Sequence, residues 1–353
     1  MLTKSPYLSI VVTTRNDNHG GDLLKRTIAF VNGLIFQCEK YKLHAELIIV
    51  EWNPPKDKPL LKEVLPPPPQ NTFLEIKYIV VPEEIHKTYK TSSTIPLYQM
   101  TAKNVGIRRA KGEFILCTNI DILFSDECFK IFAQQKLKQN VFYRANRCDV
   151  KNGLLDFSDF KSQLEYAKAN VITRHGKSPD NEALLNVPRF IYYFPRIAAL
   201  LNKLVIGVWK MLQPGIYPHF TIDFMACGDF TLMSKKDWME LQGYAELDMY
   251  SIHIDSMALW AATALGKKQI IFPYKAGVYH IYHEDGWESD DVLKTIRFLE
   301  SKPCLDYSIV FKGGMQIVSK KQNWNLNSAD WGFANKHLKE YIFEPGKPMQ
   351  EIN

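Results

Sequence analysis

The sequence predicts an α/β fold in which a mostly parallel sheet is flanked by helices. Over the first 125 residues, continuous apolar runs alternate with segments of helical periodicity, and polar residues gather where the apolar runs end. Repeated β-α-β units bury a parallel sheet between helices, so its strands are apolar on both faces. With 353 residues, 46% hydrophobic and 12% aromatic, the chain can form a substantial folded core.

Four apolar segments of this first part are expected to form strands of the sheet. Continuous apolar runs of this kind are expected of strands that are buried on both faces. In chain order they are residues 7–13, 45–52, 73–81 and 114–117. One helix is expected after the first strand, with Asp22 as its N-cap, and another over residues 100–112.

Polar residues follow three of these strands at their carboxyl ends. The three groups are Arg15–Asp17, Glu51–Asn53 and Asn119–Asp121. In open parallel sheets, ligands bind beyond the carboxyl ends of the strands. The three groups are therefore expected to converge on one crevice.

The middle of the chain has a different pattern. Residues 189–212 are strongly apolar, and cations recur in them at seven-residue spacing, at Arg189, Arg196, Lys203 and Lys210. Seven residues nearly complete two helical turns, so from Arg196 onward the cations share one helix face. Two interpretations stay open: an amphipathic helix packed on the core with its basic edge in solvent, or an interfacial helix on an anionic bilayer.

The chain is expected to divide into three parts: residues 1–150, a helical, amphipathic insert at 151–215, and residues 216–353. The last part returns to compact mixed structure. Within it, residues 307–318, which contain two consecutive glycines, are expected to form a β-hairpin.

Charge and cysteine usage limit the possible functions. The net charge of +6 arises from 44 basic and 38 acidic residues, and no basic run has interleaved aromatics, so nucleic acid is not an expected partner. The six cysteines lack metal-like spacing, which favours a reduced, cytoplasmic compartment. No segment reaches the roughly 20 apolar residues of a membrane span. Peripheral contact with the inner face of a membrane is expected only through residues 189–212.

An ordered set of segments resembles the GT-A fold glycosyltransferases, specifically the family 2-like inverting enzymes that use nucleotide-sugar donors. The first half contributes LSIVVTTRND, ELIIVEW and KNVGIRRAKGEFILCTNIDI. The second half contributes GDFTLMSKKDWMELQGYAE, HIDSMAL and VYHIYH. The resemblance implies a GT-A, Rossmann-like sheet, with donor binding in residues 1–150 and acceptor binding and catalysis in residues 216–353.

The resemblance also implies a metal site for Mn²⁺ or Mg²⁺. Hard cations of this kind prefer oxygen ligands, and Asn119 and Asp121 would project to the same side of an extended chain. Asp121 would be the direct ligand, and His280 would complete the site, with His283 as the alternative. Asn119 stands where the family has Asp, which leaves the strength of metal dependence open. A strand-capping turn residue is the simpler interpretation of Asp121.

A UDP- or GDP-sugar donor would bind around this metal at the strand ends. The residues that the resemblance places along the donor site are Thr13, Arg15, Asn16, Asp17, Glu51, Asn104, Arg108 and Asn119. The sequence has EWNP after the second strand, where the family more often has Asp-Asp-Gly-Ser, so the base stays open.

An inverting transfer needs a carboxylate that deprotonates the acceptor hydroxyl. Asp255 matches the aspartate of the family's Glu-Asp pair, although Ile254 replaces the glutamate. Glu246 is the second catalytic candidate, and Gly228 and Asp229 are expected to contact the acceptor. A helix N-cap is the simpler interpretation of Asp255.

The expected function is therefore metal-assisted, inverting transfer of a sugar to a hydroxyl of a glycan or lipid-linked glycan. A sugar nucleotidyltransferase is a weaker alternative, because it should show a Gly-rich phosphate loop that TTRNDNHGG lacks. A nucleotide-sugar or carbohydrate-binding protein without catalysis is a further alternative, and Asn119 and Ile254 are its best support. A Rossmann dehydrogenase is excluded because no GxGxxG follows a strand.

Overall fold

The computed structural model describes most of the chain. The described ranges are residues 5–66, 73–176, 222–283, 301–320, 327–344 and 347–352, with Pro68, residues 183–185 and a few isolated positions. The predicted amphipathic helix at residues 189–212 lies outside them, apart from Leu200 and Leu204. No helix within the described ranges is long and apolar enough to cross a membrane.

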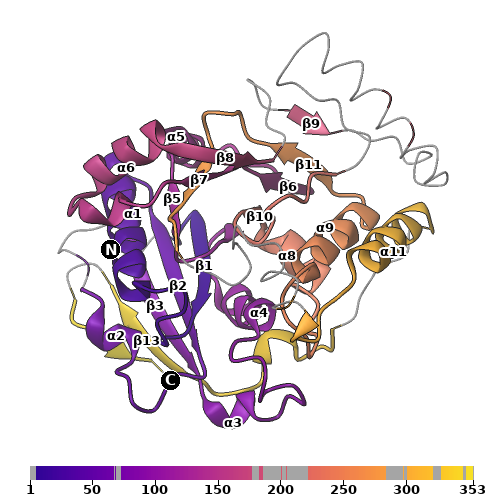
Figure 1. Ribbon diagram of the computed structural model, residues 1–353, viewed down its shortest axis with the longest axis horizontal. Coiled ribbons are helices and arrows are strands. Elements are labelled where there is room, and N and C mark those ends of the chain that lie inside the picture. Colours follow the sequence, from indigo (N-terminus) through magenta and orange to yellow (C-terminus); the bar gives the residue numbers. More distant parts are fainter. Residues whose placement is uncertain are drawn as a thin grey trace.

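A ten-stranded sheet forms the centre of the molecule (Figure 1). Its strands in spatial order are β14 (Gln350–Glu351), β13 (Lys339–Phe343), β3 (Leu74–Val81), β2 (Ala45–Trp52), β1 (Leu8–Thr14), β4 (Phe114–Cys117), β10 (Thr231–Ser234), β6 (Val141–Arg144), β11 (Lys268–Ile271) and β9 (Ala183–Leu185). The neighbours β3, β2, β1 and β4 are parallel, and β13, β10 and β9 run against the direction that the other strands share. The order β3-β2-β1-β4 is that of Rossmann-like sheets, so the predicted α/β class is confirmed.

Helices cover both faces of this sheet (Figure 1). One layer holds α1 (Leu23–Tyr41), α5 (Asp126–Ala133) and α6 (Phe160–Ala169). The other holds α4 (Gln99–Arg109), α8 (Lys235–Leu241), α9 (Ile254–Ala264) and α11 (Tyr307–Lys320). Short helices α2 (Leu61–Val64) and α3 (Glu83–His86) lie in the connections on either side of β3.

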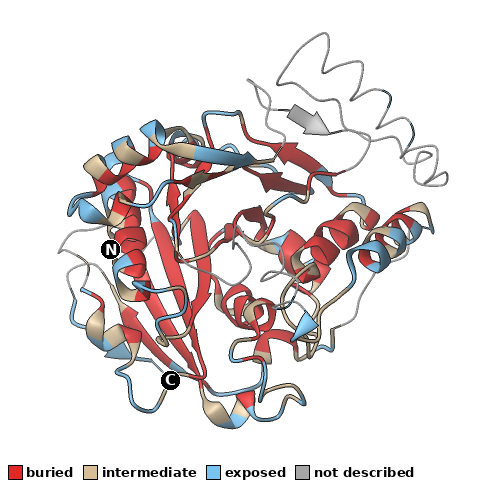
Figure 2. Cartoon of the chain, viewed as in Figure 1, coloured by how far each residue is buried: buried red, intermediate tan, exposed pale blue. Residues whose placement is uncertain are grey.

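The central strands are buried along their whole length because helices pack on both sides (Figure 2). Successive side chains of a strand point to opposite faces. In β2, accordingly, Ile48 and Val50 belong to the core beneath α4 and α9, whereas Leu47 and Ile49 belong to the core beneath α1. The predicted strands therefore read as continuous apolar runs, and all four are confirmed, as are the two predicted helices.

A backbone N–H at the N-terminus of α1 finds a different hydrogen-bond acceptor from the predicted one. Asp22 occupies the N-cap position with φ 46°, but its side chain makes no capping hydrogen bond. The N–H of Leu23 instead donates to Oδ1 of Asn18 at 3.2 Å. The cap is therefore supplied by the turn that follows β1.

A second, four-stranded sheet lies beside the first. Its order is β5 (Ile122–Phe124), β12 (Val278–His280), β7 (Arg147–Val150) and β8 (Val171–His175). β5 follows β4 after a short turn, and β12 pairs with it antiparallel, with His280 opposite Ile122. This small sheet brings the late histidine segment next to the end of β4.

The hairpin predicted for residues 307–318 is wrong, because this segment is the helix α11. Gly314 serves helix packing rather than a turn. A Cβ atom on Gly314 would lie only 2.4 Å from the indole ring of Trp260 in α9. Only a residue without a side chain lets the two helices approach this closely.

The strand β13 closes one side of the large sheet by pairing antiparallel with β3. Its Glu340 is 4% exposed and lies between two cations from earlier elements. Arg109 donates through Nε to Glu340 at 2.7 Å, and Nζ of Lys77 lies 3.6 Å away. Buried charges of this kind are tolerated because they are paired.

Candidate functional site

Three potential metal ligands meet where β4 ends. Asp121 lies in the turn between β4 and β5, His280 is the last residue of β12, and His283 follows three residues later. Their ligating atoms all lie within 4.8 Å of one another. Oδ2 of Asp121 is 3.1 Å from Nε2 of His283 and 3.8 Å from Nε2 of His280. The prediction named His280 with His283 as its alternative, and the structure brings both histidines to Asp121.

The main chain holds this group in place as well as the side chains do. The N–H of Ile281, which lies between the two histidines in sequence, donates to the carbonyl oxygen of Asp121 at 2.8 Å. This bond extends the antiparallel pairing of β12 with β5 by one residue on each strand. The positions of the three side chains are therefore set by strand pairing.

The charge of Asp121 is strongly favoured. Burial alone would raise the pKa of this carboxyl, but the hydrogen bond from His283 and the charges of His280 and Arg26 lower it well below its ordinary value. Nη1 of Arg26, on α1, lies 3.3 Å from Oδ2 of Asp121. Arg26 also donates to the carbonyl oxygens of His19 and Gly21, so it links the turn after β1 to Asp121.

The group also has unused ligand atoms. Oδ1 of Asp121 and Nδ1 of His283 are buried, and no hydrogen-bond partner is found for either. Buried polar atoms are rarely left without a partner, and such an orphan needs an explanation. One carboxylate and two imidazoles form a mixed oxygen and nitrogen set that suits a divalent transition ion such as Mn²⁺. The residues present therefore fit a metal ion.

Asn119 has a different environment from Asp121. The prediction of one extended chain through both residues is wrong, because residues 120 and 121 form a turn. Oδ1 of Asn119 accepts hydrogen bonds from Gln99 and Lys103 of α4, each at 2.9 Å. Its Nδ2 donates to Asp229 at 2.5 Å. Asn119 thus connects the end of β4 to α4 and to the predicted acceptor residues.

Lys103 is a site residue that the sequence analysis missed. It is 0% exposed, and its Nζ donates to Oδ1 of Asn119 and to the carbonyl oxygen of Gly228, both at 2.9 Å. Burial lowers the pKa of Lys103, while the nearby Asp229 and Asp255 oppose this shift. The available signal was its spacing, four residues after Gln99, which places both on the helix face toward β4.

A chain of charged side chains leads from Asn119 to the histidines. Arg147 donates through Nη1 to Asp229 at 3.0 Å and through Nε to Asp149 at 2.7 Å. Asp149 lies 3.6 Å from Nδ1 of His280 and 2.5 Å from Nε2 of His175. Burial alone would raise the pKa of Asp149, but His175 and Arg147 lower it to about 2. A carboxylate behind a ligating histidine fixes the orientation of its ring.

Asp255 lies close to the predicted acceptor residues. The N-cap of α9 is His253, with φ 65°, so Asp255 stands in the first turn and the N-cap interpretation is wrong. A Cβ atom on Gly228 would lie 3.0 Å from Oδ2 of Asp255, which shows how closely the two segments approach. The structure therefore brings Gly228, Asp229, Lys103 and Asp255 together. Negative charge in the first turn of a helix is favoured by the helix dipole.

The predicted donor loop packs against the segment that follows β2. Oγ1 of Thr13 donates to the carbonyl oxygen of Val50 at 3.2 Å. Nε of Arg15 donates to the carbonyl oxygen of Asn53 at 2.7 Å, and its guanidinium pairs with Asp17 at 2.9 Å. Asn16 donates to the carbonyl oxygen of Pro59 at 2.9 Å. The polar groups after β1 and β2 do converge, as the sequence indicated.

Glu51 is buried rather than exposed at the end of β2. It is 1% exposed, its Oε2 accepts from the N–H of Leu61 at 2.9 Å, and no partner is found for its Oε1. Burial raises the pKa of Glu51 to about 7. A carboxyl in this environment is poised between its neutral and charged forms near neutral pH.

Three other predicted residues connect α4 to later segments of the chain. Asn104 donates to the carbonyl oxygen of Tyr244 at 2.8 Å and to Glu246 at 3.0 Å. Glu246 also accepts from the N–H of Gly332 at 2.8 Å. The guanidinium of Arg108 lies 4.8 Å from the ring centre of Trp331. In the described part of the chain, none of Asn104, Arg108 and Glu246 contacts the Asp121 group.

Comparison of the sequence with protein-family models and with curated proteins finds no match. Among solved structures, this chain is similar to the crystal structure of GalNAc-T7 with UDP, GalNAc and Mn²⁺, at 14% identity and a TM-score of 0.43. The likeness covers 81% of this chain and 45% of that one, so this chain matches less than half the length of that protein.

Proposed function

We propose that this chain is a family 2-like, inverting glycosyltransferase that transfers a sugar from a UDP- or GDP-sugar to a hydroxyl of a glycan or lipid-linked glycan. The observation that carries the proposal is the group of Asp121, His280 and His283 beyond the carboxyl end of β4. Two buried ligand atoms of this group lack a partner. In a sheet of this order, ligands bind at this edge.

Asp121, His280 and His283 would hold the divalent cation, Mn²⁺ or Mg²⁺. When bound there, such an ion stabilises negative charge on the leaving diphosphate. Asp149 would keep the ring of His280 oriented, and Arg26 would keep Asp121 ionised. The loop from Thr13 to Asp17 would hold the nucleotide, because it extends from β1 next to β4.

Asp255 is proposed as the general base. In the transfer, its carboxylate takes the proton of the acceptor hydroxyl, the hydroxyl oxygen bonds to the anomeric carbon, and the bond from that carbon to the diphosphate oxygen breaks. Gly228 lets the acceptor approach this carboxylate, since a side chain at residue 228 would crowd it at 3.0 Å. Lys103 and Asp229 supply the charged surroundings of this position.

A thermal-shift measurement with nucleotide sugars and Mn²⁺ tests donor and metal binding. A ligand that binds the native state raises the melting temperature by mass action. We expect one UDP- or GDP-sugar to raise it in the presence of Mn²⁺, and we expect Asp121→Ala to abolish the Mn²⁺-dependent part. The control Glu39→Gln, on the exposed side of α1, should behave as wild type. An unchanged Mn²⁺ response in Asp121→Ala would overturn the metal assignment.

A binding protein without catalysis is the second candidate, and one observation favours it. Ile254, which stands where the family has a second acid, is 2% exposed and packs in the core. Donor hydrolysis and transfer, each measured with and without Mn²⁺, distinguish the two. We expect Asp255→Asn to lower transfer by at least about 100-fold, the usual range for general bases, and to leave donor affinity nearly unchanged. Transfer at the wild-type rate in Asp255→Asn would refute the assignment of the base.

A further inference from the structure

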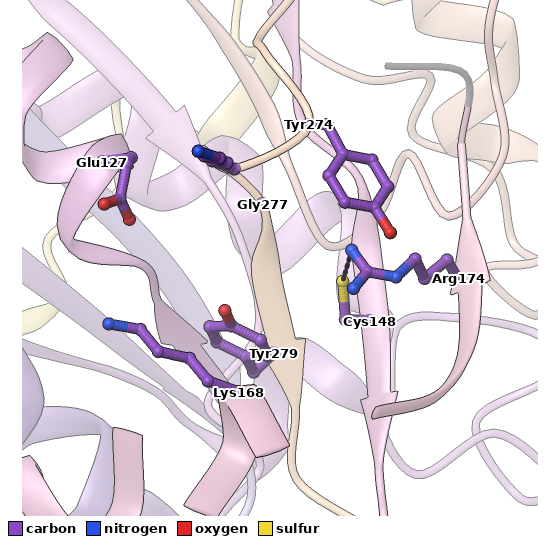
Figure 3. Close-up of a pocket in the computed structure, with 8 residues that line it drawn as sticks. Glu127, Cys148, Lys168, Arg174, Tyr274, Gly277 and Tyr279 are labelled. Carbon is purple, nitrogen blue, oxygen red and sulfur yellow. Dashed lines mark hydrogen bonds between the residues drawn. The ribbon is translucent and has the colours of Figure 1, made fainter. Parts of the chain in front are cut away.

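A pocket of about 250 Å³ opens on the small sheet, away from the Asp121 group (Figure 3). Its walls come from β7, β8, β12, the end of α6, the loop before β12 and the start of α5, which contributes Glu127. The side chains used below are Cys148, Lys168, Arg174, Tyr274, Lys275 and Tyr279. Small-molecule sites usually measure about 300–1,000 Å³, so this pocket suits a ligand of monosaccharide size.

The pocket and the Asp121 group occupy opposite faces of the same sheet. Tyr279, Cys148 and Arg174 are directly opposite one another on β12, β7 and β8, so they share one face. His280 and Asp149 form the adjacent row and point to the other face. The pocket is therefore separate from the candidate metal site, although the two sites use consecutive residues of the same strands.

Two contacts orient the exposed side chain of Arg174 at this pocket. Its Nη1 donates to Sγ of Cys148 at 3.7 Å, and its guanidinium lies 4.1 Å from the ring centre of Tyr274 (Figure 3). Burial raises the pKa of the Cys148 thiol, so the sulfur is a neutral and weak acceptor. No carboxylate among the described residues pairs with Arg174. The hydrogen-bond donors that Cys148 does not use are therefore available to an anion.

The other charged groups make the pocket positive. Lys275 is exposed, and no described carboxylate pairs with it. Lys168 lies 3.8 Å from Asp126, and Glu127 lies 3.7 Å from Lys130 outside the pocket. Burial raises the pKa of Tyr279 to about 12, so its hydroxyl keeps the proton that it can donate. Three cations and one carboxylate thus line the pocket, and the carboxylate, Glu127, is paired with Lys130.

We propose that this pocket binds the phosphate group of a small phosphate monoester, such as a sugar phosphate. Arg174 would bind two phosphate oxygens, since a guanidinium matches phosphate geometry with two parallel donors. Lys275 and Lys168 would balance the second negative charge, and the tyrosine rings would contact the organic part. A site of this kind lies outside the proposed transfer chemistry, and it holds whether or not that proposal does.

Calorimetric titration without added metal tests the pocket, with inorganic phosphate, glucose 6-phosphate and glucose as probes. We expect both phosphates to bind and glucose alone to give no heat. In Arg174→Gln/Lys275→Gln, the affinity for glucose 6-phosphate should fall at least tenfold, with the melting temperature unchanged. The matched control Lys236→Gln, an exposed lysine on α8, should stay within twofold of wild type. Equal affinity in the double variant, or the absence of heat with both phosphates, would overturn the proposal.

A phosphate monoester could also be the headgroup of a lipid, and a second arm distinguishes that source. Vesicles of phosphatidylcholine with phosphatidic acid are sedimented with the protein. If the ligand is a soluble phosphate, glucose 6-phosphate should bind. The amount of protein that sediments with the vesicles should then be the same for the wild type and the double variant. Sedimentation that depends on Arg174 and Lys275 and that glucose 6-phosphate cannot displace would contradict a soluble ligand.

Discussion

At the scale of single residues, Glu51 gives the clearest dependence of stability on pH. Burial raises its pKa from 4.5 to about 7 in the folded protein. Between these two values the folded state binds more protons than the unfolded state, so the free energy of unfolding falls as pH rises from about 4.5 to about 7. One pKa unit corresponds to about 1.4 kcal/mol, so the loss amounts to roughly 3 kcal/mol.

Glu51→Gln should remove this loss. We expect the variant to match wild type near pH 4.5 and to be more stable by on the order of 3 kcal/mol at pH 8, measured by urea unfolding. Glu84→Gln, an exposed residue on α3, serves as the control and should leave the pH profile unchanged. A wild-type profile that stays flat between pH 4.5 and 8 would contradict the raised pKa.

Single residues also show which parts of the candidate site the sequence could predict. Asp121 and His280 were predictable, because a polar residue after an apolar strand and a late histidine stand in recognisable segments. Arg26 was not, and for Lys103 the only signal was its spacing from Gln99, because helical periodicity assigns charged residues to solvent. Their burial depends on partners from distant segments, Asn119 for Lys103 and Asp121 for Arg26. No local pattern contains such a pairing.

At the scale of elements, the close packing of α9 and α11 depends on a glycine. Gly314→Ala would place its Cβ 2.4 Å from the Trp260 ring, where neither helix has room. We expect the free energy of unfolding to fall by about 1–3 kcal/mol or more, as in other overpacked cores. The partly buried Gly313 is the matched control, and Gly313→Ala should be far less destabilising. Equal effects of the two substitutions in chemical unfolding would refute the packing role.

The same pair of helices explains why residues 307–318 were predicted incorrectly. Two consecutive glycines between apolar residues indicate a hairpin turn when only local preferences are considered. Tertiary packing decides otherwise here, because Gly314 provides room for an indole ring. The first strands and helices were predictable because burial on both faces leaves a direct pattern of apolar residues. A helix–helix contact leaves no such local pattern.

At the scale of the whole molecule, Glu340 joins the end of the chain to the sheet and to α4. Glu340→Ala would leave Lys77 and Arg109 without their buried partner. Breaking a buried ion pair on one side costs about 3–5 kcal/mol, and we expect a loss of this size in urea unfolding. The control Glu344→Ala removes only the more exposed ion pair with Lys347 and should cost at most about 1 kcal/mol. Similar losses for both variants would show that β13 adds little to the closed sheet.

The antiparallel strand β13 and the chain of charges from Asn119 to His280 could not be predicted, for a shared reason. Each joins segments far apart in sequence, as Arg109 and Glu340 or Asp229 and Arg147 are. The sequence shows which side chains carry charge, and the topology alone determines which of them meet. The location of the candidate site followed from strand ends, whereas its internal connections required the fold.

The hydrogen bond from the Ile281 N–H to the Asp121 carbonyl also makes the site observable without a substrate. This amide exchanges its proton with solvent when its hydrogen bond to the Asp121 carbonyl opens. An ion shared by the three side chains would oppose this opening, so the slowing of deuterium uptake at Ile281 should increase with the ratio of the Mn²⁺ concentration to its dissociation constant. Deuterium uptake at this one amide would then report the stability of the ligand group.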